Sequence, residues 1–219
     1  MRIIDINKEQ LINFLVDTSI RIGKGSNGIV SIYDNQTLIK IHCKDIINSY
    51  YSNDFDSIDE EIEEKLALEN EMKKIGLGKT NKLKQLINKL DKSNSKLIEG
   101  IVMYREYPIG VLMKYYSGYK SLGDVLLNLT DDEKIIVYNK IEMLLYNLVE
   151  SGIYMSDIKF DNIVIDENTL DVKIIDLDDQ ETTIRDNAHS KEYTLKKIAN
   201  FLDLYNSYIR DEAKKKRWF

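Results

Sequence analysis

The sequence predicts an α+β fold, because strand patterns gather in its first 116 residues and mainly helical patterns follow. Short apolar or alternating runs predict strands at 20–33, 38–41, 97–104 and 109–116. Apolar residues at helical spacing predict helices at 7–16, 58–75, 80–92, 130–150 and 192–215. With 219 residues, 43% of them hydrophobic, the chain is long enough for one large domain or two small lobes.

Two of the predicted helices carry clear start signals, and one long segment carries none. Asn7 is the expected N-cap of the first helix, with Gln10 at the capping-box position. Thr130 and Glu133 form the same signature at the start of the 130–150 helix. Residues 44–57 are rich in Tyr, Asn and Ser, which favours a polar loop.

Composition and charge exclude several classes of function. The net charge of −6 argues against nucleic acid as a partner. The single cysteine, Cys43, excludes internal disulfides and cysteine-based zinc sites, and two histidines supply little for histidine chemistry. No window is apolar enough for a membrane span, and the N-terminus does not resemble a cleavable signal peptide.

A glycine-rich turn lies between the strand patterns at 20–33. Gly23, Gly25 and Gly28, with Ser26 among them and Val30 after them, match G-x-G-x-x-G-x-V. Glycines at such positions let backbone N–H groups approach phosphates without obstruction by a Cβ atom. A dinucleotide-binding fingerprint would need a helix after the third glycine, whereas a strand pattern follows here. An ordinary hairpin that contains glycines remains the alternative.

Lys40 lies among apolar residues in the short strand pattern at 38–41. A buried lysine loses hydration unless it meets a negative partner, and the phosphates of ATP or a glutamate on a helix would provide one. The alternative is an edge-strand lysine that points into water.

A predicted hairpin at 163–175 is flanked by side chains suited to phosphoryl transfer. Asp157 can accept the proton of a hydroxyl, and Lys159 can neutralise a γ-phosphate. Asn162 and Asp176 supply oxygen atoms suited to Mg²⁺, and the two short strands between them would bring them together. The alternative is an ordinary hairpin with solvated acids.

Together these motifs resemble the eukaryotic-like protein kinases over about residues 20–178, in the family's order. The resemblance implies a bilobal fold in one kinase-like domain, 1–219. Its N-lobe, at about 1–117, would be an antiparallel sheet with a helix, and its shortened C-lobe, at about 118–219, would be mostly helical. It also implies ATP and Mg²⁺ in the cleft, and Lys159 resembles the Ser/Thr type of catalytic loop.

The resemblance assigns further roles to individual residues. Lys40 would grip the α- and β-phosphates and be held by Glu69 of the 58–75 helix, with Glu71 and Glu64 as rivals. Met113 would face the adenine, and the backbone near Tyr115 would read its edge. The rest of the implied site consists of the catalytic base Asp157, the metal ligands Asn162 and Asp176, and the nucleotide-covering residues Gly23, Gly25, Ser26, Gly28 and Val30.

The sequence also departs from the kinase pattern. Met155 and Ser156 replace His-Arg, so no arginine is present there to bind a phosphorylated activation loop. Leu177 and Asp178 replace Phe-Gly, and no A-P-E motif follows. The short C-terminal part resembles minimal kinases that bacterial pathogens deliver into host cells. That likeness implies a monomer, cytoplasmic or secreted into a host cytosol as an effector, with a protein substrate and possible activation by a host partner.

The sequence is therefore interpreted as an ATP- and Mg²⁺-dependent minimal Ser/Thr protein kinase. Two alternatives stay open. A pseudokinase scaffold fits the altered residues at 155, 156 and 178, and a small-molecule kinase fits the reduced C-terminal part.

Overall fold

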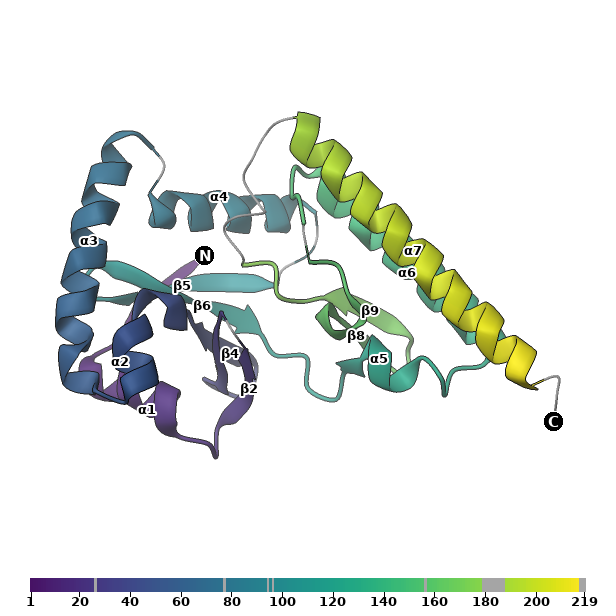
Figure 1. Ribbon diagram of the computed structural model, residues 1–219, viewed down its shortest axis with the longest axis horizontal. Coiled ribbons are helices and arrows are strands. Elements are labelled where there is room, and N and C mark those ends of the chain that lie inside the picture. The colour runs from purple at the N-terminus through teal and green to yellow at the C-terminus, as the bar shows by residue number, and fades with distance from the viewer. Residues whose placement is uncertain are drawn as a thin grey trace. The chain divides into compact units, whose positions relative to one another are not determined.

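The computed structural model describes residues 1–25, 27–76, 78–93, 95, 97–155, 157–178 and 188–216, with backbone alone for 188, 189 and 210–216 (Figure 1). Helices and a mostly antiparallel sheet make up this part of the chain, which confirms the α+β expectation. The chain divides into two compact units: the first comprises 1–88 and 96–116, and the second comprises 89–95 and 117–219.

A six-stranded sheet forms the centre of the first unit. Its strands are β1 (Arg2–Asp5), β2 (Arg21–Gly25), β3 (Gly28–Ile32), β4 (Thr37–Ile41), β5 (Ile98–Tyr104) and β6 (Tyr107–Lys114). They lie in the order β1-β5-β6-β4-β3-β2, and every neighbouring pair is antiparallel except β1 with β5. The sequence did not indicate β1, because this mostly exposed edge strand lacks a buried apolar face.

The two faces of this sheet differ in what they contain. Ile39 and Ile41 of β4 join a buried cluster with Leu11, Ile58 and Ile62 from the helices of the same unit. Because side chains alternate along a strand, residue 40 lies on the opposite face.

The helices α1 (Lys8–Val16), α2 (Ile47–Ser52) and α3 (Ile58–Lys74) belong to this unit, and so does most of α4 (Lys79–Lys92). The capping box of Asn7 and Gln10 is present at the start of α1, as expected. The expected polar loop at 44–57 is wrong, since α2 and two 3₁₀ turns, Cys43–Asp45 and Phe55–Ser57, occupy it. Tertiary contacts stabilise α2: the Ser49 amide and hydroxyl donate to Glu61 of α3, at 2.6 and 2.5 Å.

The second unit combines a small sheet with helices. Its strands are β7 (Lys120–Ser121), β8 (Ile163–Asp166) and β9 (Asp171–Ile174), all antiparallel. Its helices are α5 (Leu122–Val125), α6 (Asp131–Glu150) and α7 (Ala188–Lys216), and a 3₁₀ turn spans Phe160–Asn162. Figure 1 shows α7 lying along α6, and the two helices are in contact. Of the helices in the described part of the chain, none is long and apolar enough to cross a membrane.

The capping box at the start of α6 provides a test of local stability. The Thr130 hydroxyl accepts from the Glu133 amide, and the Glu133 carboxylate accepts from the Thr130 amide at 2.7 Å. We expect Thr130→Ala to lower the free energy of unfolding by about 1 kcal/mol, because an amide of the first turn loses its partner. Thr130→Ser keeps the hydroxyl and should stay within experimental error of the wild type. Urea denaturation measures both, and equal losses would contradict the capping role.

Candidate active site

The segment 157–162 carries three of the predicted side chains and lies between α6 and β8. The Lys159 ammonium lies 2.7 Å from a carboxylate oxygen of Asp157. The side chain of Asp157 is 58% exposed and that of Lys159 is 48% exposed, so both can contact a ligand that arrives from solution. An acid and a base are thus presented together at an accessible point of the second unit.

Asn162 braces this segment from below the surface. Its buried side-chain amide donates to the Asp157 carbonyl at 3.1 Å and to the Asp157 carboxylate at 3.2 Å. The side-chain NH₂ group is therefore engaged by Asp157, and the amide oxygen remains as an acceptor. Asp157 and Asn162, which sequence analysis paired as base and metal ligand, are joined by direct hydrogen bonds.

The residue that precedes Asp176 connects it to the same segment. The Ile175 amide donates to the Asn162 carbonyl at 2.8 Å, continuing the pairing of β8 with β9 beyond the strand ends. Asp176 itself has a φ of 64°, in the left-handed region that non-glycine residues seldom adopt. Such conformations gather at functional sites, where the surrounding structure holds them in place.

The electrostatics of this loop favour a charged lysine. The hydrogen bond that Lys159 donates to Asp157 raises the pKa of Lys159, and the nearby charges of Asp176 and Asp161 act in the same direction. Because the pKa of an ordinary lysine is already above 10, the ammonium keeps its charge across the neutral range. Lys159 therefore supplies a permanent positive charge beside Asp157.

The donor set of the second unit fits Mg²⁺. A carboxylate at Asp176 and an amide oxygen at Asn162 are hard oxygen ligands of the kind that this cation prefers. Within the described ranges, no group of three or more His, Cys, Asp and Glu residues could hold a metal alone. Mg²⁺ commonly binds through one or two protein carboxylates together with water and phosphate.

One face of the sheet in the first unit collects four of the predicted nucleotide-binding residues. Gly23, Val30 and Lys40 are partners in one row across β2, β3 and β4, and Val111 of β6 continues the row. Met113 pairs with Leu38, two residues from Lys40, and so lies on the same face. The buried Lys40 is thus set among apolar side chains, as expected, on the face away from Ile39 and Ile41.

The glycines of the turn have different structural roles. A Cβ atom added at Gly23 or Gly25 would meet nothing within 4 Å, so the backbone there is open to a ligand. At Gly28 the same atom would lie 2.3 Å from the Ile41 carbonyl oxygen. Gly28 is therefore required by the close approach of β3 and β4, whatever binds beside it. Ser26 lies outside the described residues.

The structure gives Glu69 a capping role that the sequence did not indicate. Its carboxylate, only 4% exposed, accepts from the Lys79 amide at 2.6 Å and the Thr80 amide at 3.2 Å, capping the start of α4. The expected pairing of Glu69 with Lys40 stays a prediction. Helix α3, which carries Glu69, also contributes Ile58 and Ile62 to the cluster on the face of the sheet opposite Lys40.

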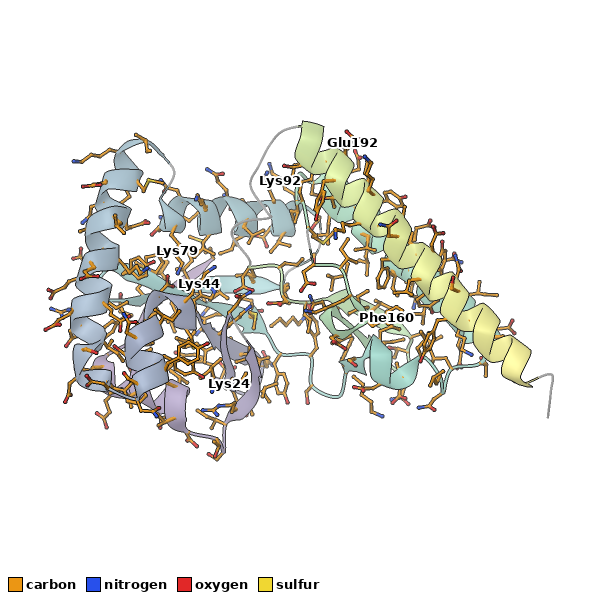
Figure 2. All side chains as sticks on the ribbon, viewed as in Figure 1. Lys24, Lys44, Lys79, Lys92, Phe160 and Glu192 are labelled. Atoms are coloured by element: carbon orange, nitrogen blue, oxygen red, sulfur yellow. The ribbon has the colours of Figure 1, made fainter. Side chains whose placement is uncertain are left out.

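The apolar residues of α3 are not all on its buried side. Met72 is exposed, together with Leu68 and Ile75 of the same region. Approximate helical spacing did not distinguish the buried side of α3 from its exposed side. The side chain of Lys79, labelled in Figure 2, forms a buried ion pair with Asp45 in the same unit.

The backbone expected to read an adenine edge is partly engaged. The Tyr115 amide donates to the Gln36 carbonyl at 2.8 Å, and the Lys114 amide donates to the Leu97 carbonyl at 2.8 Å. While these bonds hold, a base-edge contact from Tyr115 has to use its carbonyl. Met113 is buried, as its predicted apolar role requires.

The residues that depart from the kinase pattern are mostly buried. Met155, Leu177 and Asp178 are buried, whereas Ser156 lies outside the described residues. Thr194, which binds the backbone of Met155, and Phe160, which packs on Phe201, connect the loop around Asp157 to α7, and neither was indicated by the sequence motifs. The available signal for Phe160 was the row of aromatic residues at helical spacing in the final helix.

The contrast between two glycines gives a testable prediction. Gly28→Ala should lower the free energy of unfolding by roughly 1–3 kcal/mol, because the new methyl group collides with the Ile41 carbonyl. Gly25→Ala should change stability by less than about 0.5 kcal/mol, because its methyl group enters open space. Thermal and urea unfolding of the two variants measure this difference. A destabilised Gly25→Ala protein with a stable Gly28→Ala protein would contradict it.

Neither a scan against protein-family models nor a search of the curated proteins finds a match to this chain. The function therefore has to be argued from the residues of the site.

Proposed function

We propose that this protein is an ATP- and Mg²⁺-dependent phosphotransferase, a minimal Ser/Thr protein kinase that transfers the γ-phosphate to a protein hydroxyl. The observation that carries the proposal is the braced segment of Asp157, Lys159 and Asn162. One exposed carboxylate accepts from a lysine at 2.7 Å and from a buried amide at 3.2 Å, and the amide's residue is hydrogen-bonded to the neighbour of Asp176. Acidic residues of an ordinary solvent-exposed hairpin do not need these hydrogen bonds.

Each of these residues would have a definite chemical task. Asp157 accepts the proton of the attacking hydroxyl, for which an exposed carboxylate beside the acceptor is sufficient. Lys159 places a fixed positive charge where phosphate oxygens gather negative charge. Asn162 and Asp176 would hold Mg²⁺, which when bound neutralises the charge of the phosphate oxygens.

The first unit supports the nucleotide half of the proposal. The glycine turn joins β2 to β3, and Lys40 lies on the next strand, β4, as the order of the kinase motifs requires. Gly23, Val30 and Lys40 occupy one row of the sheet. They offer open backbone, an apolar side chain and a positive charge in turn, a combination that suits a nucleotide. The lysine that would contact the α- and β-phosphates is held in place by the strand itself.

A second candidate function is a pseudokinase scaffold, and one observation favours it. The Tyr115 amide is already bonded to Gln36, so the adenine site lacks one expected donor. Against it stands the joint presence of Lys40, Asp157, Asn162 and Asp176, which a scaffold has no chemical need to keep. A small-molecule kinase would use the same phosphate chemistry, and comparing small hydroxyl acceptors with protein lysates separates it from the protein kinase. A host location and an activating partner are further parts of the proposal.

The proposal predicts that two substitutions abolish transfer and leave the fold intact. Asp157→Asn removes the proton acceptor, and Lys40→Met removes the charge while keeping a chain of similar length in its buried row. Label transfer from γ-labelled ATP to a lysate, with Mg²⁺, measures both. We expect each variant to lose at least about 100-fold in rate.

Asp132→Asn serves as the matched control, because Asp132 is an exposed acid of the first turn of α6. Its transfer rate should equal that of the wild type. Transfer by Asp157→Asn at the wild-type rate would contradict the assignment of Asp157 as the base.

The proposal also predicts that most of the stabilisation of the protein by ATP requires Mg²⁺. At an ATP concentration about 100 times its dissociation constant, binding should add about 2.7 kcal/mol to the free energy of unfolding. Excess EDTA should remove most of this gain, and so should Asp176→Ala, because the cation loses its carboxylate. Thermal-shift titration with ATP measures it. Absence of any shift in the wild type would favour the scaffold that binds no nucleotide.

A further inference from the structure

Helix α7 holds the 157–162 segment from its N-terminal side through Thr194. The Thr194 hydroxyl, in a residue only 1% exposed, accepts from the Met155 amide at 3.1 Å and donates to the Met155 carbonyl at 3.3 Å. Both backbone groups of the buried Met155 are thereby satisfied by one side chain. Met155 lies two residues before Asp157, so this contact fixes the position of the backbone that leads into Asp157.

The same helix holds the segment from its C-terminal side through Phe160, which is labelled in Figure 2. The Phe160 ring makes edge-on contacts with the rings of Phe201, Tyr205 and Tyr208, with centroids 5.2, 6.3 and 6.1 Å away. Edge-to-face geometry at these separations is the favourable arrangement for aromatic pairs. Asp157 and Lys159 therefore lie between two anchors on one helix.

The contacts come from one stripe of α7. Thr194, Ile198, Phe201 and Tyr205 are spaced by three or four residues and are all buried, so they share a face of the helix. Tyr205 also fastens this face to α6, because its hydroxyl donates to the Lys134 carbonyl at 2.9 Å. This face of α7 therefore connects the loop to α6 as well.

We propose that α7 positions the loop for phosphoryl transfer, with Thr194 as a positioning residue that acts through the backbone of Met155. This inference rests on the proposed function and adds a residue that the kinase motifs do not contain. The physical requirement is precision, because a catalytic carboxylate must be held within about 0.5 Å of its productive position. A lost anchor lets Asp157 move, which slows transfer without changing the groups that contact the nucleotide.

The test compares two substitutions at Thr194 in the full chain. Thr194→Val keeps the shape of the side chain and removes the hydroxyl, whereas Thr194→Ser keeps the hydroxyl. We expect Val to lower kcat by about tenfold or more with little change in the KM for ATP, and Ser to restore most of kcat. A structural role alone would affect both variants in proportion to their loss of thermal stability.

A second pair of variants covers the case in which Thr194→Val does not fold. Tyr208 is exposed at its edge of the stripe and contacts Phe160, so Tyr208→Leu should keep the melting temperature and lower kcat several-fold. Tyr193→Leu is the matched control, because Tyr193 is an exposed tyrosine of the same helix that contacts Lys197. Its kcat should stay unchanged.

The outcomes separate this inference from the proposed function. Equal kcat in Thr194→Val and Thr194→Ser, or in Tyr208→Leu and Tyr193→Leu if Thr194→Val is unfolded, would overturn the positioning role while the kinase activity stands. Absence of label transfer by the wild type, with lysate and Mg²⁺ present, would overturn the proposed function and the positioning role together.

Discussion

The hydrogen bonds of Asn162 are the interaction on which the candidate site depends. Its side-chain amide holds both the carbonyl and the carboxylate of Asp157, and its carbonyl accepts from Ile175 beside Asp176. One buried residue therefore connects an exposed acid to a strained one across the β8–β9 hairpin. A buried amide that lost these partners would be left unsatisfied, which costs free energy. The burial of Asn162 therefore favours the loop geometry in which Asp157 accepts its hydrogen bonds.

The two faces of the first sheet have separate roles, and this separation positions the predicted nucleotide-binding residues. Apolar residues of one face pack with α1 and α3, and the row of Gly23, Val30 and Lys40 is left on the other. Strand alternation enforces this division, since a shift of one residue would exchange the faces. Glu69 of α3 lies near the start of α4 and caps it.

The second unit shows how a short C-terminal segment can support an exposed loop. Helix α7 contributes one hydroxyl and three aromatic rings to the loop and is itself bonded to α6. The buried contacts lie on either side of Asp157 and Lys159, and the two reactive side chains remain in solvent. Rigid helices thus hold backbone that would be mobile in an isolated loop.

The sequence by itself determined the elements with strong local signals. The capping boxes of Asn7 and Thr130, the short strand β4 and the hairpin of β8 and β9 all follow from neighbouring residues, and each is present. Only the tertiary structure decided the partner of Glu69, the edge strand β1, the helix α2 and the anchoring of the loop by Thr194. The physical reason is that these contacts join residues distant in the chain or depend on which helix face is buried. Local propensity and spacing carry no information about either.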